Sequence, residues 1–138
     1  MISDIENMLK RGNWQEARKL AQGFLSRQPN AAKVHAYLGL TYMYEADYER
    51  AIKPLKVAVT LDPKLWRAGT WLAQSLDHLQ RYEEALEAVE TALRVKPSDP
   101  TLNHLKSGLQ RNVPERVTDA WEKSVRLDWY NVELTHQD

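Results

Sequence analysis

Residues that could carry acid–base or metal chemistry are few in this sequence, and their spacing does not suit a reactive site. The histidines are His35, His78, His104 and His136, and no two of them have the one-turn helical spacing that aligns two zinc ligands. There is no cysteine, which excludes thiolate ligands, disulfides and cysteine nucleophiles. No glycine-rich phosphate loop or nucleophile elbow is present. We therefore predict a protein that is not an enzyme and that carries no metal or cofactor.

Aromatic, aliphatic and cationic side chains are instead spaced in a way that suits binding. Alternating steps of four and three positions place each set on one helical stripe. The stripes are Lys33, Tyr37, Leu40 and Tyr44, then Arg67, Trp71, Gln74 and His78, with Leu105 in a third segment. Exposed Trp and Tyr are typical of contact surfaces. We predict a peptide-binding groove, in which Lys33 and Arg67 meet polar or acidic groups. The alternative is that neighbouring helices cover some of these aromatic side chains.

The elements that position these residues repeat along the chain at one fixed interval, the separation between Pro29 and Pro63. Four sets of positions keep this repeat interval in one register: Pro29, Pro63 and Pro97; Ala17, Ala51 and Ala85; Trp14, Tyr48 and Tyr82; Leu25, Val59 and Leu93. A fixed period of this length is the signature of a solenoid, in which each unit buries its apolar face against the next.

Each period contains two helices. In the second period the apolar residues Val34, Leu38 and Tyr42 have helical spacing, and Asp47 is a suitable N-cap for the next helix. That helix ends near Asp62, because the following proline disfavours helical backbone geometry. The small residues Ala17, Ala51 and Ala85 recur where two helices must cross closely, and Gly39 and Ala73 do the same on the first helix of a pair. The pattern predicts an all-α chain of antiparallel helix hairpins.

These residues resemble the tetratricopeptide repeat over about residues 1 to 112. The matching positions are Leu38-Gly39, Tyr42, Tyr48, Ala51, Ala58 and Pro63 in one unit, and Leu72-Ala73, Tyr82, Ala85, Ala92 and Pro97 in the next. The resemblance implies a right-handed superhelical solenoid, a concave face lined by the first helix of each pair, and a role as a scaffold or chaperone-like adaptor. The chain departs from the family at His35 and Gly69, where the family often has tryptophan.

The resemblance also bears on the kind of ligand. Some family members grip a C-terminal carboxylate with Lys and Asn one helical turn apart. The corresponding positions here hold Ala36 and Leu40, then Thr70 and Gln74, so we do not expect such a clamp. The predicted groove is more similar to members that hold hydrophobic or extended segments, such as secretion chaperones.

We expect one domain over residues 1–131, with units at about 1–31, 32–65, 66–99 and 100–131, and a tail at 132–138. The last unit would include a helix with Val117, Ala120, Trp121, Ser124 and Leu127. In the tail, Tyr130, Val132 and Leu134 alternate, which suits an extended segment. The alternative function is therefore a self-associating assembly protein, whose groove is filled by its own or a neighbour's C-terminal tail.

The charge balance limits the partners. Lys plus Arg and Asp plus Glu both number 19, and no basic face is visible, so we expect neither nucleic acid nor anionic membrane as a partner. The sequence shows no signal peptide and no apolar stretch long enough to cross a bilayer. We expect a cytoplasmic protein whose partner is another protein or a peptide.

Overall fold

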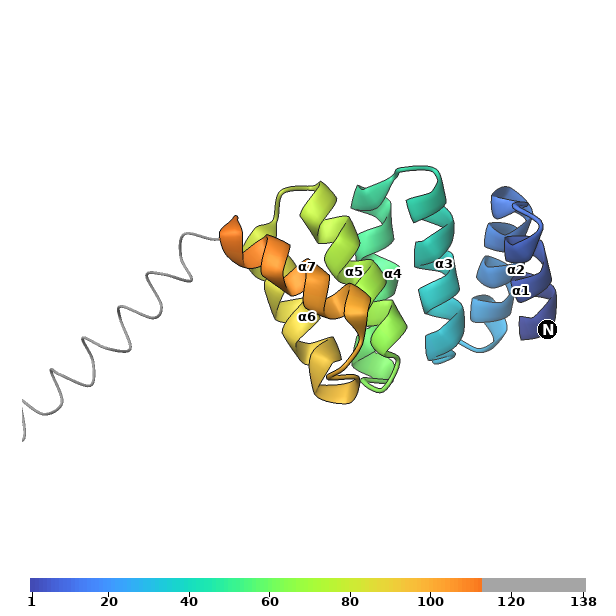
Figure 1. Ribbon diagram of the computed structural model, residues 1–138. Coiled ribbons are helices and arrows are strands. Elements are labelled where there is room, and N and C mark those ends of the chain that lie inside the picture. The colour runs from blue at the N-terminus through green and yellow to red at the C-terminus, as the bar shows by residue number, and fades with distance from the viewer. Residues whose placement is uncertain (113–138) are drawn as a thin grey trace, which may run out of the picture.

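The fold is a stack of antiparallel helices, seen in a computed structural model that describes residues 1–112 (Figure 1). The helices are α1 (Ile2–Lys10), α2 (Trp14–Arg27), α3 (Ala32–Tyr44), α4 (Tyr48–Leu61), α5 (Trp66–His78), α6 (Tyr82–Val95) and α7 (Pro100–Arg111). The predicted all-α solenoid of helix hairpins is confirmed. The helix expected near residues 117–127 and the tail at 132–138 lie outside the described residues.

The turns inside the hairpins share one backbone conformation. Gly12, Ala46 and Gln80 have φ angles of 78°, 58° and 61°, and each is separated from the next by the repeat interval. The N–H of the next residue donates across each turn at 2.8–2.9 Å: Asn13 to Met8, Asp47 to Tyr42, and Arg81 to Leu76. This left-handed residue satisfies carbonyls at the end of the first helix and reverses the chain. The Asp47 side chain then accepts a hydrogen bond from the Arg50 N–H at 3.2 Å, which confirms the predicted N-cap.

Small residues allow the paired helices to lie close together, as the sequence predicts. Ala17, Ala51 and Ala85 are all 0% exposed. At Gly39, an added Cβ would lie 2.5 Å from Cγ of Leu55, closer than any real contact between carbon atoms. The backbones of α3 and α4 can therefore approach only because position 39 has no side chain.

The core runs along the stack between successive hairpins. One buried cluster joins α4, α5, α6 and α7 around Leu55, Leu76, Leu86 and Leu102, and a second joins α1, α2 and α3 around Ile5 and Val34. Each hairpin buries its apolar residues against its neighbours, so the stack is stable as a whole rather than hairpin by hairpin.

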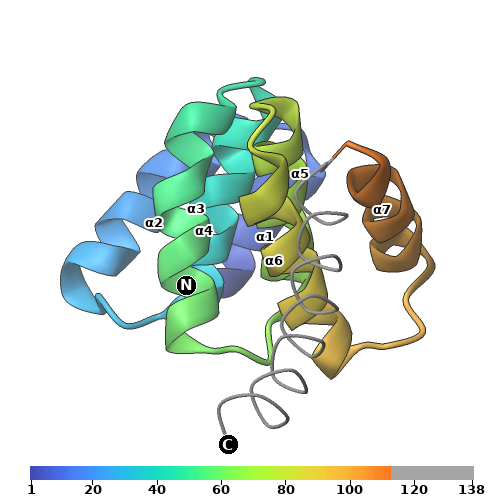
Figure 2. The ribbon, with the colours of Figure 1, turned by 90° about the vertical axis from the view of Figure 1, so that its left-hand side faces the viewer.

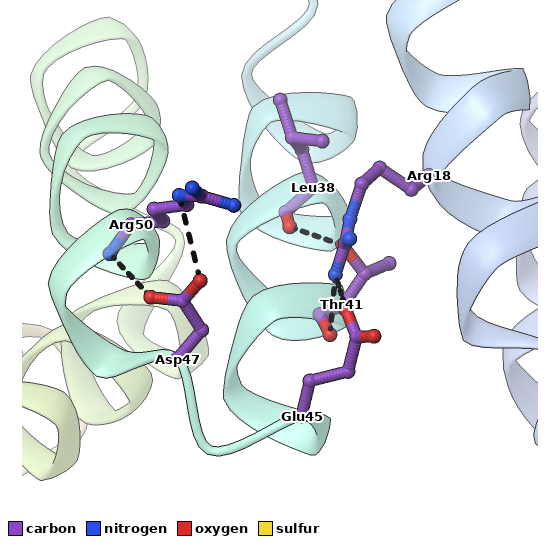
Figure 3. A network of polar contacts seen from close by, with 6 residues as sticks. All are labelled: Arg18, Leu38, Thr41, Glu45, Asp47 and Arg50. Atoms are coloured by element: carbon purple, nitrogen blue, oxygen red, sulfur yellow. Dashed lines mark hydrogen bonds and ion pairs between the residues drawn. The ribbon is translucent and has the colours of Figure 1, made fainter.

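A polar network joins α2 to α3 (Figure 3). The Arg18 guanidinium donates to the Thr41 hydroxyl and to the Thr41 carbonyl oxygen, both at 3.1 Å, and to the Glu45 carboxylate. It also lies 3.9 Å from the centre of the Tyr42 ring. One repeat interval after Arg18 and Thr41 the chain has Ile52 and Ser75, so the next interface lacks the cation. The Ser75 hydroxyl is buried there and has no hydrogen-bond partner among the described residues.

Candidate binding groove

A groove of about 400 Å³ lies between the first helices α1, α3 and α5. Figure 2 shows α2 and α4 on one side of the stack and α7 on the opposite side. The predicted residues that line this groove are Lys33, Tyr37, Leu40, Arg67 and Trp71. They come from α3 and α5, whose stripes face each other because hairpins that recur at a fixed interval stack in register.

Tyr44 and His78 lie outside this groove, in stacks with the preceding helix of the solenoid. The Tyr44 ring stacks on Trp14 with centroids 3.8 Å apart and planes inclined by 15°, and the His78 ring stacks on Tyr48 at 4.1 Å and 2°. The second pair follows the first by one repeat interval, so both stacks are part of the repeat packing. Tyr44 nevertheless remains 52% exposed.

Gln74 and Leu105 also lie outside the groove. Leu105 is half-buried and packs against the core cluster that joins α4 to α7. Gln74 is half-buried on α5, one turn after Trp71. Of the residues predicted for the groove, the structure therefore brings together the first three of the α3 stripe and the first two of the α5 stripe.

Sequence reasoning missed the contribution of α1. The groove is also lined by Glu6, Leu9 and Lys10 from α1, by Ala36 and Ala68 from the other first helices, and by Leu65 before α5. Two of them, Glu6 and Lys10, could have been predicted from the repeat. They precede Leu40 and Tyr44, two residues of the predicted stripe, by one repeat interval. The first helix is short and its matching residues are polar, which hid the correspondence.

Glu6 is already engaged inside the groove. The Tyr37 hydroxyl donates to its carboxylate, and the Lys33 ammonium lies 3.7 Å from the same oxygen. Burial, together with the hydrogen bond to Glu6, raises the pKa of Tyr37 well above its ordinary value. The phenol therefore stays protonated and holds the carboxylate in a fixed position.

The cationic groups of the groove exceed its acidic groups. Lys10, Lys33 and Arg67 line it together with a single carboxylate, that of Glu6. In the described part of the chain neither Lys10 nor Arg67 forms an ion pair, and the Arg67 guanidinium lies 5.1 Å from the centre of the Trp66 ring. The floor is apolar, with Leu9, Leu40 and Trp71. Such a site suits an apolar side chain next to a negative charge.

Within residues 1–112, no group of three His, Asp or Glu side chains is placed to hold a metal ion. Among the described helices, none is both long enough and apolar enough to cross a membrane.

Comparison with known proteins places this architecture among helical repeat proteins. The family model described as "Anaphase-promoting complex, cyclosome, subunit 3" matches residues 10–92. The chain is 29% identical over 124 residues to the type IV pilus assembly protein PilF of Pseudomonas aeruginosa, covering 87% of this chain and 49% of that protein. It is 25% identical over 129 residues to an N-terminal acetyltransferase A complex subunit-like protein of Schizosaccharomyces pombe, covering 92% and 19%. The chain thus spans about half the length of one relative and about a fifth of the other.

Solved structures share the fold. The first TPR of Spaghetti (RPAP3), bound to the HSP90 peptide SRMEEVD, has a TM-score of 0.77 at 17% identity, covering 80% of this chain and 88% of that one. The second TPR domain of human RPAP3, in complex with the HSP70 peptide SGPTIEEVD, has a TM-score of 0.73 at 20% identity, covering 78% and 90%. A crystal structure of MamA protein has a TM-score of 0.76 at 16% identity, covering 97% and 73%.

Proposed function

This chain belongs to the family of the anaphase-promoting complex, cyclosome, subunit 3 model, a tetratricopeptide-repeat family, and on that premise we propose that it holds an extended polypeptide segment in the groove between α1, α3 and α5. The segment would present an apolar side chain to Leu40 and Trp71 and an acidic group to Arg67. The observation that carries the proposal is the combination of an apolar floor with uncompensated positive charge.

The ligand chemistry follows from the groove's own residues. Peptides bound by the RPAP3 domains carry consecutive acidic residues, which supports an acidic segment here as well. At Ala36 and Leu40, however, the groove has apolar side chains, so it favours a hydrophobic residue within the segment over a terminal carboxylate alone. Ligand charge would decide the orientation, and apolar contact would supply most of the affinity.

The expected affinity is low. Tyr37 and Trp71 are already half-buried, so a ligand can cover only about a third of the 150–250 Å² that an aromatic side chain buries in full. At about 25 cal/mol per Å², the two side chains would contribute about 2.5–4 kcal/mol before the cost of association, which is on the order of 4–15 kcal/mol. With the contribution of Leu40 and of the charges, we expect a dissociation constant in the high micromolar to millimolar range.

The test uses two acetylated nonapeptides that differ only in charge. One alternates Glu with Leu and Phe, and the other has Lys in place of every Glu. We expect the acidic peptide to bind in calorimetry and the basic peptide not to bind. The Trp71→Ala variant should bind the acidic peptide with a loss of about 2 kcal/mol, or roughly thirtyfold, as interface anchors do.

Gln74→Ala is the matched control, because Gln74 lies on the same helix outside the groove. It should bind like the original chain, and circular dichroism should show equal helix content in both variants. Equal binding of the two peptides, or an unchanged affinity after Trp71→Ala, would remove this groove as the binding site.

A further inference from the structure

A second cavity lies between α4, α5 and α6 and shares only Leu65 with the groove. Its volume is about 250 Å³, and its walls are largely apolar, with Val59, Trp66, Leu72 and Leu76 among them. Gly69 of α5 and Pro63, in the loop before α5, also line it, and Glu84 and Glu87 of α6 supply its acidic groups. None of the roles proposed above uses this cavity.

The repeat shows what is missing at this place. His35, Gly69 and Asn103 occupy equivalent positions in successive units, each one repeat interval from the next. The His35 ring nitrogen Nε2 donates to the Pro29 carbonyl oxygen at 2.7 Å, and the Asn103 amide donates to the Pro97 carbonyl oxygen at 3.0 Å. At Gly69 there is no side chain to make the corresponding bond.

Of the equivalent carbonyl groups of Pro29, Pro63 and Pro97, that of Pro63 therefore has no side-chain donor in the repeat. Among the described residues it accepts no hydrogen bond at all, whereas its counterparts in the units before and after it do. The glycine also permits close packing, since a Cβ at position 69 would lie 3.1 Å from Cβ of Ala92. The cavity thus has the space of an absent side chain, and it is lined by Pro63, the residue whose carbonyl oxygen lacks the donor that the other units supply.

Charge adds a second requirement. Glu84 is engaged by Arg81 at 2.6 Å and by Lys56 at 3.6 Å. The Glu87 carboxylate, in contrast, has no partner within the described part of the chain. An occupant that carries a positive charge beside its apolar group would complement Glu87.

We propose that this cavity is a recognition site for a partner polypeptide that inserts a tryptophan next to a basic residue. Tryptophan has a large apolar ring system and one N–H donor, which matches apolar walls and a single free carbonyl. Size allows it, because an engineered cavity of about 150 Å³ already holds benzene. The indole N–H would replace the donor that His35 and Asn103 supply elsewhere, and the basic residue would face Glu87.

Three blocked dipeptide amides test the proposal on the full chain: N-acetyl-Trp-Lys, N-acetyl-Phe-Lys and N-acetyl-Trp-Glu. Methyl signals of Val59, Ala88 and Ala92 report on the cavity by NMR titration. We expect N-acetyl-Trp-Lys to shift them and to bind about tenfold more tightly than either of the others, because one control lacks the donor and the other reverses the charge. Equal affinities for the three probes would overturn the proposal, as would the absence of shifts at these methyls.

Two variants separate recognition from folding. Gly69→Asn restores the amide found at Asn103 and should abolish the shifts caused by N-acetyl-Trp-Lys. The Cβ of an asparagine at position 69 would lie close to Ala92, so Gly69→Asn could also disturb the packing. Glu87→Gln therefore serves as a second variant, which leaves the packing unchanged. It should reduce the preference for N-acetyl-Trp-Lys over N-acetyl-Trp-Glu by about tenfold, and an unchanged preference would contradict the role of Glu87.

The chain's own tryptophans provide the last control. Trp121 and Trp129 lie outside the described residues. If replacing both with Phe alone shifted the cavity methyls and increased the binding of N-acetyl-Trp-Lys, the occupant would be this chain's own C-terminal segment, and the assignment to a partner would be overturned. Unchanged signals in that double variant support the assignment.

Discussion

Arg18 donates hydrogen bonds to both the hydroxyl and the carbonyl oxygen of Thr41, each at 3.1 Å, and so joins one hairpin to the next. The Arg18 side chain is only 18% exposed. Ile52 and Ser75 occupy the equivalent positions of the following interface, and there the Ser75 hydroxyl finds no hydrogen-bond partner among residues 1–112. One interface of the solenoid is therefore polar and the next is apolar, although the helices pack in the same way.

Replacing Arg18 with methionine should destabilise the chain by about 2 kcal/mol, because hydrogen bonds of a charged group are lost and the Thr41 hydroxyl loses a donor. Urea unfolding followed by circular dichroism measures the change. Arg50→Met is the matched control, since the Arg50 side chain is 74% exposed and pairs with Asp47 at the surface. Its effect should stay within about 0.5 kcal/mol. Equal losses in the two variants would contradict a special role for Arg18.

Ser75→Ala should increase the free energy of unfolding by about 1 kcal/mol. The buried hydroxyl has no partner in the part of the chain that the structure describes, and such a group carries a desolvation cost that alanine avoids. The comparison is Thr41→Val, which removes a hydroxyl that is hydrogen-bonded and should lower stability by about 1–2 kcal/mol. In thermal unfolding, the midpoint temperature should rise for Ser75→Ala and fall for Thr41→Val. A destabilised Ser75→Ala variant would show that the hydroxyl has a partner after all.

Replacement by alanine should have opposite effects on stability at Gly39 and at Gly23. Gly39→Ala places a methyl group 2.5 Å from Leu55 and should cost about 1–3 kcal/mol through overpacking. Gly23→Ala, inside α2, meets nothing within 4 Å and should stabilise by about 0.5–1 kcal/mol, because alanine favours the helix. Denaturant titration of the pair checks both. Similar effects in the two variants would mean that α3 and α4 do not approach as closely as described.

Tyr37 predicts a specific dependence of stability on pH. Its pKa in the folded chain is raised by burial and by the hydrogen bond to Glu6, so folding favours the protonated phenol. The contribution of Tyr37 to stability is therefore complete below the unfolded pKa of about 10 and is lost progressively as the pH rises above it. The stability difference between the original chain and Tyr37→Phe should shrink from pH 8 to pH 11 in urea unfolding. A difference that grew over this range would mean that the pKa shift has the opposite sign.

The repeat made the fold predictable from sequence. The helix boundaries at Asp47 and Asp62 depend on local backbone chemistry, a cap and a following proline, and the structure has both boundaries where the sequence puts them. The sequence also indicated where helices pack closely, because a small residue such as Gly39 recurs wherever a larger side chain would collide with the paired helix.

The groove was predicted only in part, because its outline depends on how successive hairpins cross. The spacing placed Tyr37 and Trp71 on stripes of their helices, and both residues line the groove between α1, α3 and α5. The spacing could not show that Tyr44 would stack on Trp14 and His78 on Tyr48. These stacks depend on how α2 lies beside α3 and how α4 lies beside α5. The sequence marked the place of the second cavity only as a departure from the family at Gly69, and it could not show that the neighbouring helices leave the space unfilled.

The left-handed turns at Gly12, Ala46 and Gln80 have a consequence for how the length of this chain can change. Each turn places the next helix in the same relation to the last, so duplicating residues 48–81 would reproduce existing interfaces and yield a longer, foldable protein. A copy that lacked one residue inside a helix would rotate the rest of that helix by about 100° and turn its apolar face away from its neighbours. Duplication of a whole repeat unit therefore lengthens the stack while keeping every helix in register.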